Sequence, residues 1–525
     1  MIYLSQNKKE IFWITFLYVI AYGLLLLNKG HFWDDWILVD VDPKEVLDVF
    51  RQAGTPWAWS GHYHNLLLGL SHNILAYRLL TFFTFLISGY FFYSILLSIK
   101  EVDSRARFIL TLFFVLIPVN SARIALINTP YALTYFTYFF AFYLISRSDF
   151  RSNLLLKTLT FLLLMFSFNT ASLLVFYFGT ILLFLFYKNF HKDSNLPKSQ
   201  FIINFIKLNW WLILAPFIFY ISKSYFWKPY GIYEGYNQIN LSLLIRPMTQ
   251  FPNSMLEISG FSLSTVTVVL IALVIISLRL KKIRPSNMLR NILGLISGIL
   301  LCWLALFPYL LIGLNPDHTG WNSRNQLLVP LGLSFILFFV IELIADSFPK
   351  HAFLRFYLTT IIISFFIIKN VDKQIDFERD YLAQTNLINL FAHDPLFKSG
   401  DNFILHNEVK TWANNRSLSF YEFSGMSRKA LGDQSRWASN SAEQKYKKNK
   451  LFIHEKYNLK DFKGKSHVIE LRIINGPASD ALMGRMGVLK LMLIDQFDSD
   501  SFKTSMENYL LIKPTIYSRK VVPES

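Results

Sequence analysis

Residues 11–40 read IFWITFLYVIAYGLLLLNKGHFWDDWILVD, an apolar run followed by two adjacent carboxylates. The run from Ile11 to Leu27 contains no charged residue, and a helix needs roughly 20 mainly apolar residues to cross a bilayer. Lys8 and Lys9 precede the run as in a signal peptide, but no cleavage site of small residues follows it. We therefore expect a retained first membrane helix that ends shortly before the two carboxylates.

The composition places the whole chain among membrane proteins. It has 525 residues, of which 53% are hydrophobic and 17% aromatic, and its mean hydropathy is +0.35. Soluble domains are less apolar and do not repeat apolar runs of roughly 20 residues. The single cysteine, Cys302, excludes an intrachain disulfide. It lies in an apolar stretch, where we expect it to act as a small buried hydrophobe.

Apolar windows along the chain predict about eleven membrane helices, by the criterion of roughly 20 residues for each crossing. The predicted fold class is therefore a polytopic α-helical membrane protein. The predicted spans are Ile11–Leu27, Ala76–Leu97, Phe108–Val119, Tyr131–Ser146, Leu154–Phe168, Ser172–Phe186, Leu208–Tyr225, Ser262–Leu278, Ile292–Ile312, Leu327–Ile344 and Phe356–Ile368.

Basic residues concentrate in alternate connections between these spans. The chain has 52 Lys and Arg against 35 Asp and Glu, a net charge of +17. In a soluble protein this excess would suggest nucleic acid, but here it follows the positive-inside rule, so no nucleic-acid partner is expected. The rule places the N-terminus in the cytoplasm, and an odd number of spans places the C-terminal part outside. The residues concerned are Lys100, Arg105, Arg107, Arg147, Arg151, Lys157, Lys188, Lys192, Lys198, Lys281, Lys282, Arg284, Arg290, Lys350 and Arg355.

The composition changes after residue 370, which divides a membrane module (1–370) from a small α/β domain on the outer face (371–525). Charge rises there, and runs typical of strands alternate with helical patterns such as Asp376–Phe391. The predicted strands are NFILHNE (402–408), HVIELRII (467–474), VLKLMLI (488–494) and YLLIKP (509–514). A polar, aromatic segment at 414–437 is expected to be a surface loop or a contact for an acceptor.

The connection 28–75 is the longest between predicted spans and contains a second structural signal. Asp42 precedes Pro43 in the order of a helix N-cap and a first helical proline. Apolar residues then recur on one face until Gly54, which predicts a short amphipathic helix in the membrane interface. A second amphipathic stretch is expected at Asn65–Ser71.

Asp34 and Asp35 have no such capping function in the predicted helix. One interpretation is that they end the first membrane helix in water, between the interfacial aromatics Trp33 and Trp36. However, adjacent carboxylates repel each other unless they share a proton, a cation or a substrate group. Against aromatic side chains, one of them is expected to have a raised pKa and to serve as a general base.

This arrangement resembles the GT-C superfamily of membrane glycosyltransferases, which transfer sugars from polyprenyl-phosphate carriers. The shared features are a first span, an acidic pair in the outer loop that follows, interfacial helices, many further spans and an outer C-terminal domain. Relatives include protein mannosyltransferases, the lipid A aminoarabinose transferase and O-antigen glucosyltransferases. The resemblance implies an inverting enzyme of the bacterial inner membrane, with Asp34 or Asp35 as the catalytic base. The acceptor would be a glycan, a lipid or a protein.

Sugar transfer from a lipid phosphate also requires a cation to neutralise the departing phosphate. Arg324 stands just before an apolar helix, where similar proteins carry an arginine, although an interfacial anchor would look the same. The predicted phosphate ligands are Arg324, Lys228, Arg78 and Arg123, and Lys223 and Arg246 are further basic residues on this side. Residues 120–131 contain no second acidic residue, which argues against a mechanism with two carboxylates or a metal.

Several polar residues of the outer loops are candidates for contacts with sugar, acceptor or lipid headgroup. They are His62, His64, Asp317, His318 and Glu234. His62 and His64 could ligate zinc only with a third ligand such as Asp34 or Asp35, and paired carboxylates can also hold a divalent cation. We expect no metal site. Interfacial aromatics, or solvation of a turn, would explain Glu234, Asp317 and His318 without a ligand.

Two other functions fit a membrane protein of this kind. A transporter or flippase of lipid-linked sugars predicts ionisable residues within spans, broken helices or related halves. A polymerase or ligase of surface polysaccharide predicts a large loop with Arg and His between later spans, whereas the longest loop here comes first. A scaffold that binds through its outer domain is a further alternative. Membrane lipids are expected partners in each case.

Overall fold

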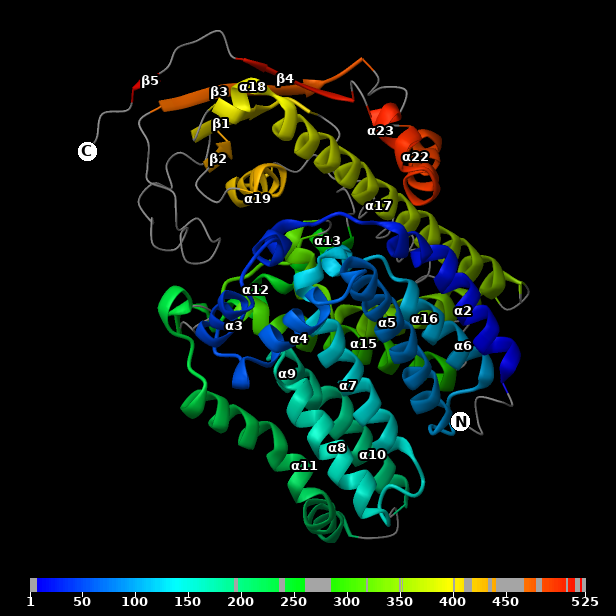
Figure 1. The fold of residues 1–525 in the computed structure, drawn as a ribbon. Coiled ribbons are helices and arrows are strands. Elements are labelled where there is room, and N and C mark those ends of the chain that lie inside the picture. Colours follow the sequence, from blue (N-terminus) through cyan, green and yellow to red (C-terminus); the bar gives the residue numbers. More distant parts are fainter. Residues whose placement is uncertain are drawn as a thin grey trace.

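The computed structural model shows a large helical part with a small sheet at one end (Figure 1). The structure describes residues 7–192, 197–235, 241–259, 285–317, 320–348, 351, 353–399, 402–409, 418–432, 437–440, 467–477, 484–506, 509–514 and 520–521.

The helical part consists of long apolar helices joined by short turns. Seven of the described helices are long and apolar enough to cross a membrane, and α8 is a shorter apolar helix. This architecture is compatible with a polytopic helical membrane protein. The helices are α2 (Lys8–Tyr22) with its extension η1 (Gly23–Leu27), α5 (Asn73–Leu97), α6 (Ser104–Leu116), α7 (Thr129–Ser146), α8 (Leu154–Ser167), α9 (Ser172–Tyr177) continued by η6 (Phe178–Leu182) and α10 (Leu183–Lys192), α11 (Lys198–Phe226), α15 (Pro285–Leu311), α16 (Val329–Ser347) and α17 (Leu354–His393).

Each predicted span that falls on described residues coincides with a helix. The predicted span Ser262–Leu278 lies outside the described residues. The number of crossings stays a prediction, because α6 has 13 residues and α8 has 14. Both are short for a helix that must cover roughly 30 Å of hydrocarbon.

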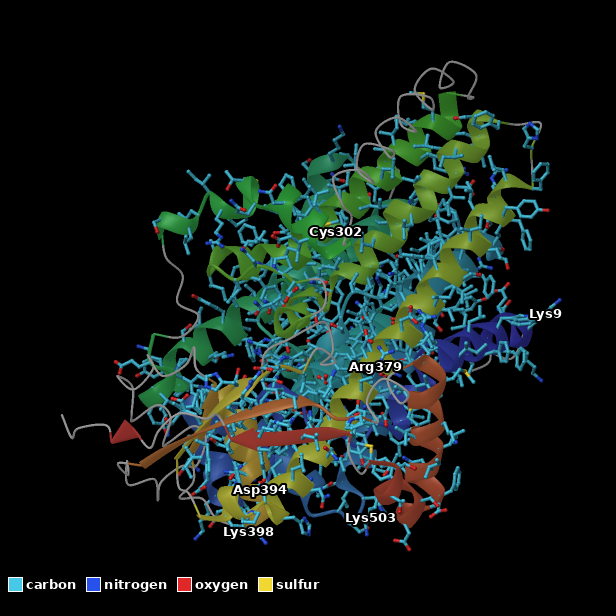
Figure 2. All side chains as sticks on the ribbon, turned by 90° about the horizontal axis from the view of Figure 1, so that it is seen from above. Lys9, Cys302, Arg379, Asp394, Lys398 and Lys503 are labelled. Carbon is cyan, nitrogen blue, oxygen red and sulfur yellow. The ribbon has the colours of Figure 1, made fainter. Side chains whose placement is uncertain are left out.

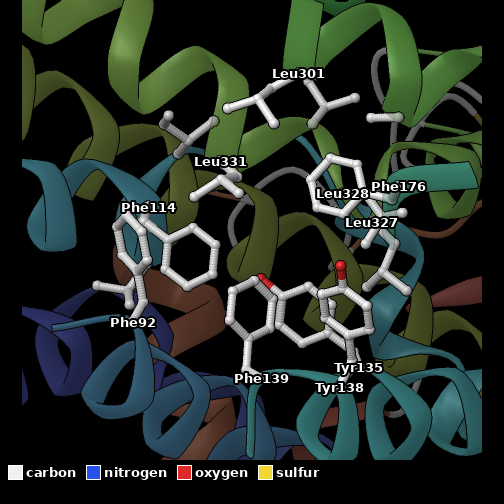
Figure 3. Packing of buried hydrophobic residues seen from close by; sticks show 14 of the residues in the cluster. Phe92, Phe114, Tyr135, Tyr138, Phe139, Phe176, Leu301, Leu327, Leu328 and Leu331 are labelled. Carbon is white, nitrogen blue, oxygen red and sulfur yellow. The ribbon is translucent and has the colours of Figure 1, made fainter. Parts of the chain in front are cut away.

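Two kinds of contact hold the helices together. Aromatic rings fill the space between α5, α6 and α7, where Phe114 lies 4.7 Å from Phe92 and 5.1 Å from Phe139, centroid to centroid (Figure 3). Helices α15 and α16 instead approach through small residues. A Cβ atom on Gly332 would lie 2.6 Å from the carbonyl oxygen of Gly298, so neither position accepts a larger residue without a shift.

The connection between η1 and α5 contains the predicted amphipathic helix. Helix α3 (Pro43–Gln52) begins at Asp42, whose side chain accepts from the Lys44 amide at 2.8 Å. Gly54 follows the helix with φ +70°, which confirms the predicted stop. Helix α4 (Trp59–Leu68) begins six residues before the predicted 65–71 stretch, so this boundary was wrong. The other short helices are η2 (Trp33–Leu38), η3 (Pro56–Ala58), η4 (Ser121–Ile124), η5 (Leu126–Asn128), η7 (Gly231–Tyr233), η8 (Leu241–Leu243), α12 (Arg246–Thr249), α13 (Phe251–Ser259) and η10 (Trp321–Gln326).

The C-terminal part is a mixed α/β unit, as predicted. Its five-stranded sheet has the order β2-β1-β3-β4, with β5 also paired to β3. Strand β1 is parallel to β2 and β3, and β3 is antiparallel to β4 and β5. The elements are β1 (Asn402–Asn407), β2 (Trp437–Asn440), β3 (His467–Asn475), β4 (Leu510–Pro514), β5 (Lys520–Val521), α18 (Pro395–Ser399), α19 (Phe420–Leu431), α22 (Arg485–Phe497) and α23 (Ser499–Met506).

Three of the four predicted strands are confirmed, and the fourth is a helix. The run VLKLMLI lies in α22, where Val488, Leu491 and Met492 are buried and Leu493 is 56% exposed. Burial at positions i, i+3 and i+4 is the period of a helix. The period is hard to recognise in the sequence, because every residue of the run except Lys490 is apolar. The segment 414–437 was predicted to be a surface loop or a contact for an acceptor, and its residues Phe420–Leu431 form the buried helix α19.

The predicted boundary at residue 370 falls inside one helix. Helix α17 runs without interruption from Leu354 to His393, and the C-terminal unit follows its C-terminal half. Viewed from above, Cys302 lies among the apolar helices, whereas Asp394, Lys398 and Lys503 gather in the C-terminal unit (Figure 2). Cys302 is fully buried, as expected.

A pair of substitutions in α22 tests its helical period. Leu491→Ala should lower the free energy of unfolding by about 2–5 kcal/mol, because it removes a buried side chain. Leu493→Ala should change it by less than about 0.5 kcal/mol, because that side chain is largely exposed. Thermal unfolding of the purified protein in detergent, followed by protease resistance of the C-terminal unit, measures both. Equal effects would indicate a strand, in which residues 491 and 493 share a face.

Candidate functional site

The two adjacent carboxylates lie in the 3-10 helix η2 but have different surroundings. Asp35 is fully buried, and Asp34 is partly exposed. One oxygen of Asp35 accepts from the Phe32 amide at 2.9 Å and the other from the Ile127 amide at 2.8 Å. Asp35 therefore has a structural function that the sequence did not indicate: it caps η2 and joins it to η5.

The environment of Asp35 also changes its acidity. Burial raises the pKa of the Asp35 carboxyl from 3.8 to about 7, against the lowering effects of its amide donors and of Arg78. A group with this pKa exists in both protonation states near neutral pH. The predicted raised pKa thus belongs to the residue that is less accessible to a substrate.

The backbone immediately before Asp34 is strained. Trp33 has φ +51°, a left-handed conformation that a bulky residue rarely adopts and that costs about 1–3 kcal/mol. Its ring contacts Trp321 and Phe377, at centroid distances of 5.4 and 5.9 Å. Its amide donates to Glu422 at 3.3 Å. Contacts from three distant segments thus hold the Asp34 turn in place.

Two further turns, η4 and η10, meet beside this strained turn. The hydroxyl groups of Ser121 and Ser323 are 2.9 Å apart, and the Ala122 amide donates to Ser323 at 2.9 Å. Arg123 and Arg324, one from each turn, line a common cavity. The residues that line this cavity are Thr81, Phe85, Asn120, Arg123, Asn128, Tyr131, Ala132, Arg324 and Leu327. We call it the arginine cavity.

The two arginines of the cavity are held by neutral groups. Arg123 donates to Tyr22 and to the Asn120 carbonyl, each at 2.9 Å, and lies over the Tyr22 ring. The Arg324 guanidinium lies 3.9 Å from the centre of the Trp321 ring. Neither forms a salt bridge within the described residues. The cavity therefore has positive charge and is suited to an anion.

An amide group adds polar character to the arginine cavity. The Asn120 side-chain oxygen is buried and has no hydrogen-bond partner among the described residues. Such an acceptor is costly unless a ligand or water donates to it. It is suited to a hydroxyl or amine donor, whereas the guanidinium groups suit an anion. The lining thus offers groups for both an anion and a hydrogen-bond donor.

The Asp34 turn is attached to both walls of this cavity. On one side Trp33 packs on Trp321 of η10, and on the other Asp35 binds Ile127, which precedes the cavity residue Asn128. The structure therefore brings the acidic turn, Arg123 and Arg324 into one neighbourhood. The sequence predicted all of these residues but not their connection.

Arg78 has a different environment from the other predicted phosphate ligands. It is 2% exposed, and its guanidinium donates to the backbone carbonyls of Asn28, Gly30 and Ile124. It does not line the arginine cavity. These contacts fix the path of the chain after α2. They favour a positioning function, although its predicted role as a ligand stays untested.

The two predicted histidines, His62 and His64, lie in different surroundings. On α4, His62 is exposed and His64 is buried against Phe50 and Tyr77. His64 Nδ1 is 2.8 Å from the Tyr77 hydroxyl, and burial lowers the pKa of His64 to about 3. No group of three His, Cys, Asp or Glu within the described residues could hold a metal ion.

The remaining predicted residues lie away from the arginine cavity or outside the described chain. Lys228 and Glu234 are exposed on a segment that docks on α3, where the Tyr230 amide donates to the Gln52 carbonyl at 2.9 Å. Asp317 is partly exposed and accepts from Gln326 through its carbonyl. His318 lies outside the described residues.

Sequence reasoning missed the uncharged residues of the site. Asn120 and Asn128 lie in a short turn with no distinctive spacing, and Ser121 and Ser323 are 202 residues apart in sequence. Glu422 was also missed, although SFYE (419–422) has the order of a capping box, and the structure shows that box at α19. A helix beginning at Ser419 could have been recognised, but its contact with η2 could not.

Comparison with known proteins gives no assignment. No family model matches the chain, and neither does any curated protein or solved structure. The function must therefore be inferred from the residues of this chain.

The buried Asp35 carboxyl makes a prediction about pH and stability. Its pKa is higher in the folded protein than the unfolded value of 3.8, so the folded state binds more protons between about pH 4 and pH 7. The free energy of unfolding should consequently fall as pH rises through this interval. Asp35→Asn lacks this titrating group, so its free energy of unfolding should depend less on pH than that of the wild type.

Near pH 4, where the wild-type carboxyl is protonated in the folded state, Asp35→Asn should be less stable than the wild type. Asparagine has one acceptor oxygen, so the amide of Phe32 or Ile127 loses its partner, at a cost of about 1–3 kcal/mol. Thermal unfolding between about pH 4 and pH 8 measures both effects. Asp48→Asn, in an exposed ion pair with Arg51, is the matched control. An Asp35→Asn protein with the wild-type pH profile would contradict the burial of this charge.

Proposed function

We propose that this protein is a GT-C-type membrane glycosyltransferase that moves a sugar from a polyprenyl-phosphate carrier to a glycan, lipid or protein acceptor. The observation that carries the proposal is the arginine cavity beside the acidic turn. A phosphate-linked sugar needs cations for its phosphate and a carboxylate for its acceptor. The two arginines line the cavity, and the acidic turn contacts the segments of its walls through Trp33 and Asp35.

Arg123 and Arg324 are the proposed phosphate ligands. Guanidinium groups bind phosphate through two parallel N–H donors, and both arginines lack a carboxylate partner in the described chain. At the other end of α16 the arginines are paired instead: Glu342 binds Arg105 at 2.8 Å and Arg355 at 3.2 Å. The contrast favours a ligand function for the two arginines of the cavity.

Asp34 is the proposed general base. Asp35 uses both of its oxygens for backbone amides and is buried, whereas Asp34 is partly exposed on the same turn. Of the two neighbours, Asp34 is therefore better suited to meet an acceptor hydroxyl. Asp35 would position it.

The proposed reaction is a single displacement. The acceptor oxygen forms a bond to the anomeric carbon of the sugar, and its proton passes to the Asp34 carboxylate. The bond from the anomeric carbon to the phosphate oxygen breaks, and its electron pair stays on the phosphate. Arg123 and Arg324 stabilise the added charge on this leaving group. Attack opposite the leaving group inverts the anomeric configuration.

The proposed location is a bacterial inner membrane, with the N-terminus in the cytoplasm. The acidic turn and the C-terminal unit lie at the same end of the helices, because α17 carries that unit beside the first loop (Figure 1). With the positive-inside rule, this end faces outward. Donor and acceptor would then meet at the outer surface of the membrane.

Substitution of the two carboxylates tests the base. Asp34→Asn should lower kcat by about 10²–10⁴-fold, because the amide cannot take a proton. The assay uses the purified protein in nanodiscs with a panel of polyprenyl-phosphate sugars, and Asp48→Asn serves as the control. Full activity in Asp34→Asn would overturn this assignment. Donor-dependent lipid translocation in liposomes, without transfer of sugar, would instead favour a flippase.

Substitution of Arg324 tests the phosphate site. Arg324→Ala should raise the donor KM by about 10- to 100-fold, equivalent to a lost charge-assisted hydrogen bond of about 1.5–3 kcal/mol. Arg324→Lys should have an intermediate effect, since it keeps the charge but loses the planar pair of donors. The control is Arg51→Ala, which removes an exposed arginine of the first loop. An unchanged donor KM in Arg324→Ala would exclude this residue as the phosphate ligand.

A further inference from the structure

We infer that helix α19 of the C-terminal unit positions the acidic turn, so that Glu422, Gly425 and Arg428 set the geometry of Asp34 from outside the membrane helices. This inference rests on the proposed function. It assigns the C-terminal unit a direct part in catalysis in addition to any contact with an acceptor. Figure 1 shows α19 between the strands and the first outer loop.

Glu422 makes the first contact at the strained residue. Its Oε1 accepts from the Trp33 amide at 3.3 Å, and its Oε2 accepts from the Ser419 amide at 3.0 Å. The same carboxylate thus caps α19 and holds the residue before Asp34. Glu422 is 1% exposed. A buried carboxylate between two amides fixes both of them.

Gly425 makes the second contact, one turn further along α19. A Cβ atom at this position would lie 2.6 Å from Cε3 and 2.9 Å from Cδ2 of Trp36. Only glycine lets the indole lie this close to the helix. Trp36 is 2% exposed and belongs to the hydrophobic core of the C-terminal unit, together with residues such as Phe423 and Leu405. Trp36, the residue after Asp35, is therefore packed in the core of the C-terminal unit.

Arg428 makes the third contact and completes one face of α19. It is 4% exposed, and its Nη2 donates to the carbonyls of Trp36 at 2.9 Å and Val39 at 2.8 Å. Both acceptors are backbone groups of η2 or its C-cap. Arg428 therefore holds the backbone at the end of η2 in place.

The three contacts bracket the acidic pair. They act at Trp33, Trp36 and Val39, on either side of Asp34 and Asp35, and two of them are bonds to the backbone. A short 3-10 helix that begins with a left-handed tryptophan is not stable alone. Catalytic groups must be held close to the productive geometry by such a supporting layer. If α19 served only to complete the hydrophobic core, the contact of Gly425 with Trp36 would be enough. The buried charges of Glu422 and Arg428, one before and one after the acidic pair, would not be needed.

Gly425→Ala separates positioning from folding. The substitution raises the helix propensity of α19 while pushing Trp36 away. Gly484→Ala, in the same unit, is the matched control, because its Cβ would meet no atom within 4 Å. We expect Gly425→Ala to lower kcat by about 10- to 100-fold with an unchanged donor KM, as for a displaced catalytic group. Gly484→Ala should behave as wild type.

Hydrogen exchange gives a second readout that does not depend on activity. In Gly425→Ala, the amides of residues 31–40 should exchange at least about tenfold faster, while those of residues 420–431 keep their protection. Both regions should be unchanged in Gly484→Ala. Unchanged exchange at residues 31–40 in Gly425→Ala would overturn the inference. Loss of protection in both regions would also overturn it, because it indicates a folding defect.

A conservative pair at Glu422 completes the test. Glu422→Gln keeps an acceptor for the Trp33 amide and should retain most of the wild-type kcat. Glu422→Leu has no such acceptor, so its kcat should fall. The outcomes also separate the two proposals. An active Asp34→Asn protein removes the proposed function. An inactive Asp34→Asn protein together with wild-type kcat in Gly425→Ala and Glu422→Leu removes the positioning function alone.

Discussion

The carboxylate of Asp35 is the constraint on which the site depends. It is buried and accepts two backbone amides, one from its own turn and one from residue 127. Because a buried carboxylate is costly without such donors, the two segments can hardly separate without exposing or protonating it. This bond joins the end of the first membrane helix to the connection between α6 and α7. Asp34, Arg123 and Asn128 take their places relative to it.

Charge is distributed unequally between the two ends of α16. Near its C-terminus, Glu342 and Asp346 bind arginines from α6 and α17, which ties those helices together. Before its N-terminus, Arg324 lies on an aromatic ring and faces a cavity shared with Arg123. Paired arginines hold helices together, whereas arginines held only by aromatic and neutral groups keep their charge for an anion. The proposed phosphate site follows from this contrast.

The C-terminal unit is joined to the membrane helices by more than a linker. Helix α17 crosses from one to the other without a break, and Trp36 from the first loop packs in the core of the sheet unit. The acidic turn therefore lies between two bodies, with Arg78 on one side and Arg428 on the other. An enzyme built in this way would couple the geometry of its base to the state of its outer unit.

The sequence by itself determined the helical architecture, because apolar runs, caps and stop signals act locally. It predicted α3 from Asp42 to Gly54 and three of the strands, and it drew attention to Asp34, Asp35, Arg123 and Arg324. It failed at α22, where an apolar run interrupted only by Lys490 conceals the helical period, and at the buried α19. Only the tertiary structure decided that Asp35 is a structural residue, that Arg78 binds carbonyls, and that Arg123 and Arg324 share a cavity. These facts depend on contacts between segments that lie tens to hundreds of residues apart in sequence, and no local pattern of side chains encodes such contacts.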